Sequence, residues 1–81
     1  MSIRVLFFAS LADVTGKRET VIEAEGHPDI VSIFNHFTAA FPQLERYRTT
    51  AHFALNSDFA RPDSPVVDGD EVAFFPPVSG G

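Results

Sequence analysis

The C-terminal residues carry the clearest chemical signal in this chain of 81 residues. The sequence ends in Gly80 and Gly81, which follow Pro76-Pro77 and Val78-Ser79. Two prolines direct a chain away from the preceding element, and glycines lack the Cβ that keeps a backbone out of a narrow channel. A carboxylate on such an end can be activated, for example as an acyl-adenylate, for attack by a sulfur or nitrogen nucleophile. We therefore predict Gly81 as the reacting residue, supported by Gly80. The alternative is an inert, frayed terminus.

The chain offers few other groups for covalent or metal chemistry. It contains no cysteine, which excludes a side-chain thiolate, a disulfide and a Cys-based zinc or iron–sulfur site. The three histidines, His27, His36 and His52, do not stand at the spacing of metal ligands. The acidic residues at 68–71 lack the pattern of a calcium loop and are typical of a turn before a strand. We expect no metal and no permanently bound cofactor.

Composition and charge narrow the class of protein. Hydrophobic residues make up 44% of the chain and charged residues 21%, as expected of one compact domain. The net charge of -5 argues against a nucleic-acid partner, because phosphate binding needs a basic surface. No run approaches the length of a membrane span. Residues 5–12, after Arg4, resemble a short signal-peptide core, but cleavage there would remove the most strand-like segment. We expect a cytoplasmic protein without a membrane partner.

Two strands are predicted in the first third of the chain. Alternation of β-branched and aromatic residues predicts a strand at 3–9, and a second strand is predicted at 19–24. Between them we expect a short turn over 11–14, capped by Ser10 and closed by Gly16. The two strands then form a hairpin with a long connection.

One main helix follows, and the last strand leads directly into the tail. Asp29 is the predicted N-cap, and Pro42 ends the helix. The apolar stripe of this helix consists of Ile30, Ile33, Phe34, Phe37 and Phe41. We expect an irregular stretch at 43–50, a strand at 51–55, a turn at 56–58, a very short strand at 59–60 and a last strand at 71–75.

Three phenylalanines are candidates for a binding surface. The first and last strands are expected to be neighbours, and their outward faces would carry Arg4, Leu6 and Phe8 beside residues 71, 73 and 75. Phe8 and Phe75 then lie opposite the face that meets the helix. With Phe59 they would form an exposed aromatic patch that docks a partner, although each of them alone could be an ordinary core residue.

Together these features resemble the small, sulfur-carrying subunits of molybdopterin synthase, which are ubiquitin-like proteins. The resemblance covers essentially the whole chain in length and element order. It is most specific at residues 5–9, Val-Leu-Phe-Phe-Ala, and at residues 68–81, DGDEVAFFPPVSGG. The sequence departs from the family at Ala12-Asp13, where an Arg-Glu pair is usual.

The resemblance implies an α+β fold of the β-grasp type, a mixed sheet with one main helix packed across it. Residues 1–75 would form this domain, and residues 76–81 a flexible tail. It also implies that a ubiquitin-activating-like adenylyltransferase uses ATP to adenylate the Gly81 carboxylate, which becomes a thiocarboxylate. The sulfur would then pass to cyclic pyranopterin monophosphate within a complex with the large synthase subunit. That complex would be a heterotetramer of two small and two large subunits.

On this basis we expect the protein not to be an enzyme alone but to act as the sulfur-donating subunit of a sulfurtransferase. Gly80 and Gly81 match the functional tail of the family. The residues expected to contact protein partners are Phe8, Phe59, Phe75, Pro76, Pro77, Val78 and Ser79.

Two other functions stay open at the level of the sequence. One is a related carrier, for thiazole biosynthesis or for ubiquitin-like tagging of proteins. The other is a β-grasp binding module with an inert tail. The Phe-Phe-Pro-Pro stretch at 74–77 favours the molybdopterin carrier. The chain has one lysine, Lys17, which gives no indication of a modifier that is linked to further copies of itself.

Overall fold

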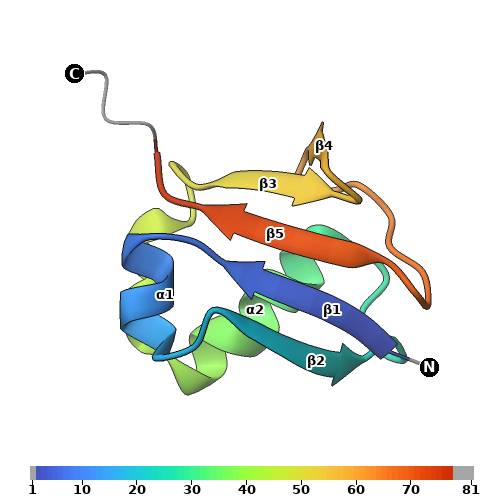
Figure 1. Ribbon diagram of the computed structural model, residues 1–81, viewed down its shortest axis with the longest axis horizontal. Coiled ribbons are helices and arrows are strands. Elements are labelled where there is room, and N and C mark those ends of the chain that lie inside the picture. Colours follow the sequence, from blue (N-terminus) through green and yellow to red (C-terminus); the bar gives the residue numbers. More distant parts are fainter. Residues whose placement is uncertain (1, 78–81) are drawn as a thin grey trace.

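The computed structural model describes residues 2–77, which fold around a five-stranded mixed sheet (Figure 1). The elements in chain order are β1 (Ser2–Phe7), α1 (Ser10–Thr15), β2 (Glu19–Glu23), α2 (Ile30–Ala40), the 3-10 helix η1 (Pro42–Tyr47), β3 (His52–Leu55), β4 (Asp58–Ala60) and β5 (Glu71–Phe75). The strand order is β2-β1-β5-β3-β4, with β1 and β5 parallel and the other pairs antiparallel. The predicted mixed sheet with one main helix is confirmed, as is the pairing of the first and last strands.

The core lies between α2 and one face of the sheet. On β1 the buried residues alternate as Ile3, Val5 and Phe7, which is the period of a strand with one buried face. Phe7 packs edge-on against Phe37 of α2, with ring centroids 5.0 Å apart. Phe74 of β5 is fully buried and lies 5.7 Å from the same Phe7 ring. Aromatic packing therefore joins the two central strands to the helix.

The start of α2 agrees with the predicted cap. Oδ1 of Asp29 accepts a hydrogen bond from the backbone N–H of Ser32 at 3.0 Å, and the Ser32 hydroxyl accepts one from the N–H of Asp29 at 3.3 Å. This reciprocal pair satisfies two backbone donors that have no partner within the helix. Ile30, Ile33, Phe34 and Phe37 are buried, as the helical spacing predicts. Phe41, the fifth residue of the predicted stripe, lies beyond the last helical residue, Ala40, and is only partly buried.

Three local predictions are wrong. The first strand ends at Phe7 rather than at residue 9, and Ser10 does not cap α1. The chain turns at Ala9, so Ser10 already lies within the first turn of the helix. The stretch at 43–50 is not irregular throughout, because η1 covers its first part and buries Leu44 completely. Leu44 and the partly buried Tyr47 anchor this short helix to the core.

Among residues 2–77, no helix has the length and apolar character needed to cross a membrane. The longest helix, α2, has 11 residues.

Candidate functional site

The outward face of the sheet carries a stacked aromatic pair where β1 and β5 end. Leu6 lies opposite Ala73 in the parallel register, and the backbone N–H of Phe8 donates to the carbonyl oxygen of Phe74 at 3.1 Å. This register brings Phe8 beside Phe75, and their rings stack with centroids 4.5 Å apart. Phe8 is 40% exposed although it is apolar. The prediction that Phe8 and Phe75 lie together on the sheet face opposite α2 is confirmed.

A shallow apolar groove runs along this face beside the pair. Ala54 of β3 lies opposite Ala73 of β5, and both are buried although they face away from α2. Their small side chains form the floor of the groove between larger neighbours. We call the apolar residues of this groove the docking patch: Leu6, Phe8, Ala54, Phe59, Ala73 and Phe75.

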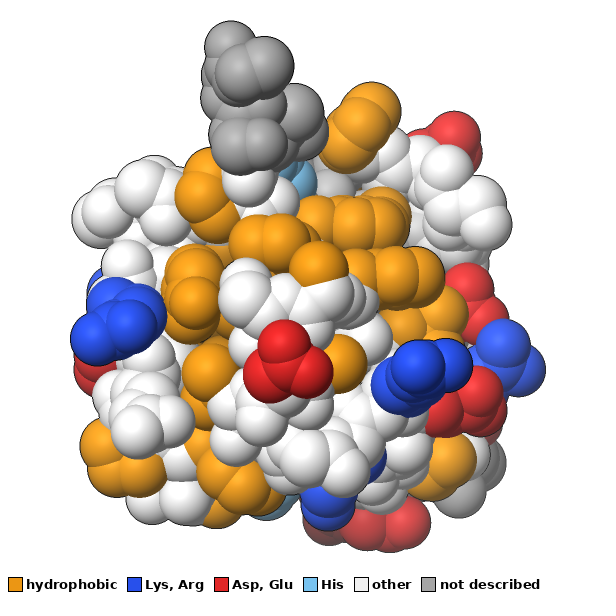
Figure 2. Space-filling model, turned by 60° about the vertical axis from the view of Figure 1, so that its left-hand side comes forward, with side chains coloured by type: hydrophobic (Ala, Val, Ile, Leu, Met, Phe, Trp, Pro, Cys, Tyr) orange, Lys and Arg blue, Asp and Glu red, His pale blue; other side chains and the backbone are white. Residues whose placement is uncertain are grey.

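Phe59 is the most exposed member of the docking patch. It lies on the short edge strand β4, opposite Ala54 of β3, and is 89% exposed. A phenylalanine so exposed buries almost none of its apolar surface within the domain, so it contributes little to folding. Figure 2 shows hydrophobic side chains gathered on the side of the molecule where β1 and β5 end. Such an apolar surface is typical of protein–protein contacts.

The docking patch continues to the point where the chain leaves β5. A hollow there is lined by Phe8, Ala9, His52, Phe59, Phe75, Pro76 and Pro77. His52 lies opposite Phe75 in the β3–β5 register. Pro76 and Pro77 therefore belong to the same apolar surface as the three phenylalanines. Val78, Ser79, Gly80 and Gly81, predicted as functional, lie outside the described residues.

The other end of the same sheet face is polar. Arg4 forms ion pairs with Glu71 on β5 and with Glu19 on β2, the latter at 3.3 Å between Nε and Oε2. All three side chains are partly or largely exposed, so the pairs add little to stability. They mark the border of the docking patch, where an apolar partner surface would have to end.

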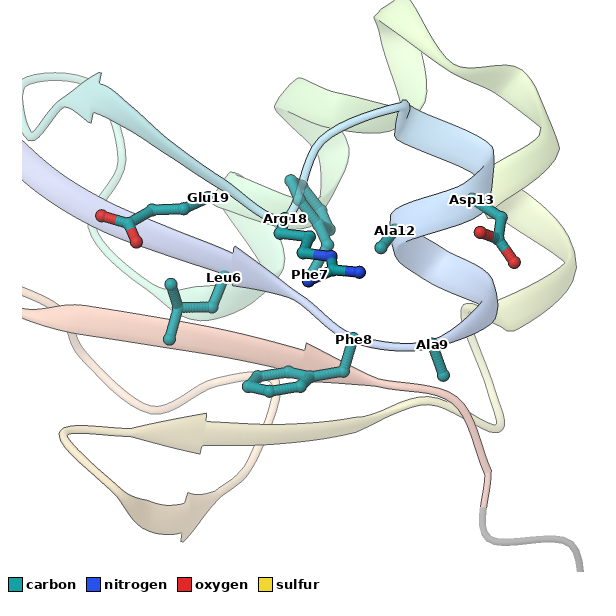
Figure 3. A pocket seen from close by; sticks show the side chains of 8 residues that line it. All are labelled: Leu6, Phe7, Phe8, Ala9, Ala12, Asp13, Arg18 and Glu19. Carbon is teal, nitrogen blue, oxygen red and sulfur yellow. The ribbon is translucent and has the colours of Figure 1, made fainter.

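A second hollow lies on the other side of Phe8, between the β1–α1 loop and the start of β2 (Figure 3). Its lining includes Ala9, Ala12 and the guanidinium group of Arg18, so it has a more polar wall than the docking patch. Asp13 also lines it, which places the Ala12-Asp13 departure from the family pattern at its edge. Among the described residues, the Arg18 guanidinium has no ion-pair partner within 4.0 Å.

The remaining polar candidates have local structural roles. The Asp68 carboxylate accepts a hydrogen bond from the backbone N–H of Ser2, and Asp70 accepts from the N–H of Val67 and from the amide of Asn56. The acidic turn therefore ties the start of β5 to its neighbours. Within residues 2–77, no group of three or more His, Asp or Glu side chains is arranged to hold a metal ion. His27 and His36 are in edge contact, 5.1 Å between ring centroids, and His52 lies apart beside Phe75.

Sequence reasoning missed the contribution of β3 to this surface. Ala54 and His52 join the docking patch and the adjoining hollow only because β3 pairs with β5 in one particular register. The residues of β3 do not indicate which strand β3 pairs with or in which register, since a short strand can pair on either side of a sheet. Leu6, in contrast, follows from the same alternation that places Phe8.

The fold is that of the ubiquitin-like β-grasp proteins, a mixed sheet crossed by one helix with the C-terminal strand in its centre. The crystal structure of the SAMP1 protein from Haloferax volcanii has a TM-score of 0.83 and 30% identity to this chain, and the match covers 100% of both chains. A chain in the protein–protein complex of subunits 1 and 2 of the molybdopterin-converting factor from Helicobacter pylori 26695 has the same fold, with a TM-score of 0.67 and 24% identity over 100% of both chains.

Residues 5–81 match the ThiS family, so the chain belongs to that family. Among curated proteins it is 39% identical to the molybdopterin synthase sulfur carrier subunit of Chlamydomonas reinhardtii, over 100% of both chains. It is also 39% identical to the protein of that name from Escherichia coli (strain K12), where the match covers 98% of this chain and 99% of the relative. The family resemblance drawn from residues 5–9 and 68–81 is thereby confirmed.

Proposed function

We propose that the protein is a sulfur carrier of molybdenum cofactor biosynthesis, which holds sulfur as a thiocarboxylate on Gly81 and delivers it as the small subunit of molybdopterin synthase. The observation that carries this proposal is the match to sulfur carrier subunits over the full length of the chain. The absence of cysteine supports the terminal position of the sulfur, because no side chain of the protein can hold a persulfide.

The chemistry at Gly81 requires two steps. In the first, the carboxylate attacks the α-phosphorus of ATP on a ubiquitin-activating-like enzyme, and pyrophosphate leaves. In the second, hydrosulfide delivered by a sulfur donor attacks the carbonyl carbon of the acyl-adenylate, AMP leaves, and the terminus becomes a thiocarboxylate. Gly80 and Gly81 suit both steps because neither carries a side chain that would obstruct an enclosed active site.

The carrier needs no acid or base of its own for this chemistry. ATP activates the carboxylate, and the enzymes that bind the tail provide the groups around it. What the domain contributes is a rigid surface from which the tail starts. The docking patch adjoins Pro76 and Pro77, so a partner bound to the patch lies beside the point where the chain leaves β5.

The proposed partner on the docking patch is the large synthase subunit. Support comes from the Helicobacter pylori complex of subunits 1 and 2 of the molybdopterin-converting factor. One chain of that complex has the same fold as this protein. The patch also has the properties of an interface core, with a stacked Phe8–Phe75 pair and the exposed Phe59 ring. We expect two small and two large subunits in the assembly, and product formation from cyclic pyranopterin monophosphate.

Protein modification is the second candidate function. It is favoured by the 30% identity to small archaeal modifier protein 1 of Haloferax volcanii, over 91% of this chain and 94% of the relative. In that case the activated Gly81 carboxylate would form an amide with a lysine of a target protein. The two functions share the activation step and differ in the nucleophile that follows.

Intact-mass measurement tests the proposal. The purified protein is incubated with an activating enzyme, ATP and a sulfur donor, and then with the large subunit and cyclic pyranopterin monophosphate. We expect a mass gain equal to the replacement of one oxygen by sulfur, lost again as molybdopterin forms. The variant that lacks Gly81 should have the same unfolding midpoint and show neither change. Sulfur loading of that variant at the wild-type rate would contradict the mechanism, and stable conjugates without thiocarboxylate would favour protein modification.

A further inference from the structure

Ala9 has a backbone conformation that its side chain disfavours. Its dihedral angles are φ 51° and ψ -126°, and the carbonyl oxygen of Phe8 accepts a hydrogen bond from the N–H of Leu11 at 3.1 Å. These values define a type II′ turn over residues 8–11 with Ala9 at the first central position. That position is normally glycine, because a Cβ there clashes with the backbone. An alanine at this place is strained.

Nothing within the described part of the domain offsets this strain. Ala9 is exposed, and it is not among the residues that pack against the hydrophobic core. Its carbonyl oxygen accepts hydrogen bonds from Ala12 and Asp13, but a glycine would provide the same carbonyl. The methyl group therefore adds strain without adding burial or hydrogen bonding to the folded chain.

The Ala9 methyl group lies on the surface around Phe8. Ala9 lines both hollows that flank Phe8, the one with Arg18 and the one with Phe59, Phe75 and the two prolines. Figure 3 shows the side chains of Phe8 and Ala9 extending to the same side of the loop. The methyl group thus extends the docking patch from Phe8 to the edge at which the chain leaves β5.

We infer that the Ala9 methyl group is a contact of the docking patch, retained in a strained turn because the large subunit packs against it. This inference rests on the proposed function, since it takes the large subunit as the occupant of the patch. The methyl group would fill a small apolar depression on the partner, next to the place where the partner contacts Phe8. Strained residues of this kind are typical of functional sites, where a contact outside the chain compensates for strain within it.

The substitution Ala9→Gly separates this role from a structural one. Glycine relieves the strain, so we expect the thermal midpoint of the isolated protein to rise by several degrees. Loss of one buried methyl group should weaken binding to the purified large subunit about fourfold. A stability gain combined with an affinity loss is the opposite of what a residue with a purely structural role would show.

Ala39→Gly is the matched control. Ala39 is also an exposed alanine, but it lies in α2 with ordinary helical geometry and away from the docking patch. Its replacement should lower the thermal midpoint, because glycine is a poor helix former, and leave the affinity unchanged.

The possible results have separate meanings. Equal affinity of Ala9→Gly and wild type for the large subunit would overturn the inference and leave the proposed function intact. A lower thermal midpoint for Ala9→Gly would overturn the premise of strain. If the wild-type protein does not bind the large subunit, the proposed partner itself is wrong, and the inference fails with it.

Discussion

The rings of Phe8 and Phe75 lie 4.5 Å apart and nearly parallel, at an interplanar angle of 11°. They belong to segments 67 positions apart in the chain, and the parallel pairing of β1 with β5 brings them together. The stack places two large apolar surfaces directly before Pro76 and Pro77. A partner that recognises the pair therefore binds next to the start of the C-terminal tail.

Replacement of Phe75 by alanine tests the docking patch. We expect binding to the large subunit to weaken by more than ~1 kcal/mol, because the change removes one half of the stacked pair from the interface. Isothermal titration calorimetry with the purified large subunit measures this loss. Val67→Ala is a suitable control, since Val67 is 65% exposed and does not line the patch. If the stability of the isolated domain falls as much as the affinity, Phe75 is a core residue rather than a contact.

Phe37→Ala tests the packing of α2 on the sheet. Phe37 is 5% exposed and meets Phe7 edge-on, so we expect a loss of about 3–5 kcal/mol in the free energy of unfolding. Chemical denaturation measures this change. The same truncation at the exposed Phe59 should alter stability by no more than about 0.5 kcal/mol. Equal denaturation midpoints for Phe37→Ala and the wild type would contradict the assigned core.

Asp29→Ala tests the cap of α2. Loss of the side-chain acceptor for the Ser32 N–H should lower the free energy of unfolding by about 1 kcal/mol. Asp29→Asn retains an acceptor oxygen and serves as the control, with stability close to that of the wild type. Denaturation curves that place both variants at the same midpoint would show that the cap has no measurable effect.

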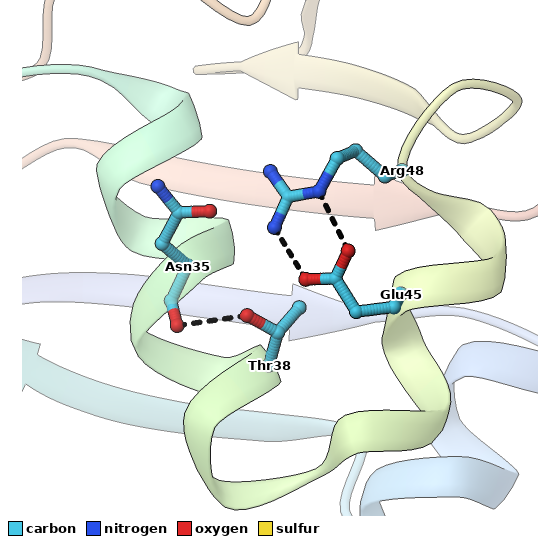
Figure 4. Close-up of polar contacts among 4 residues, drawn as sticks. All are labelled: Asn35, Thr38, Glu45 and Arg48. Atoms are coloured by element: carbon cyan, nitrogen blue, oxygen red, sulfur yellow. Dashed lines mark hydrogen bonds and ion pairs between the residues drawn. The ribbon is translucent and has the colours of Figure 1, made fainter.

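The ion pair between Glu45 and Arg48 predicts a small dependence of stability on pH (Figure 4). Hydrogen bonds from the Arg48 guanidinium hold the pKa of Glu45 below its ordinary value of 4.5. A carboxyl with a lowered pKa in the folded state stabilises the fold above its ordinary pKa, and this contribution is lost as the pH falls through the folded value. Because both side chains are partly exposed, solvent screens the pair and the effect is modest.

We therefore expect the difference in stability between the wild type and Glu45→Gln to be largest near neutral pH and to shrink below pH 4.5. Urea denaturation at a series of pH values measures it. Asp63→Asn is the control, since Asp63 forms a long, exposed contact with Arg61 at 3.4 Å. A difference for Glu45→Gln that grows as the pH falls would contradict the assigned direction of the pKa shift.

Local residue patterns were sufficient for most of the elements. Alternation within a strand and helical spacing depend only on neighbouring residues, so β1, β5 and α2 could be predicted with small errors at their ends. The same alternation predicted that Phe8 and Phe75 face away from α2, as the structure confirms. Ser10 was assigned wrongly as a cap because the turn that precedes it depends on the unusual backbone of Ala9, which no residue-type preference predicts.

The amino-acid order alone shows which apolar residues are available for a core and a surface, that a thiol is absent, and that Gly80 and Gly81 follow Ser79. The folded structure was needed to show that Ala54 and His52 join Phe8, Phe59 and Phe75 on one surface, and that Ala9 extends this surface in a strained turn. The physical reason is that strand register and turn geometry are set by long-range pairing and packing. A local pattern determines which face a side chain occupies, but not which distant side chain lies beside it.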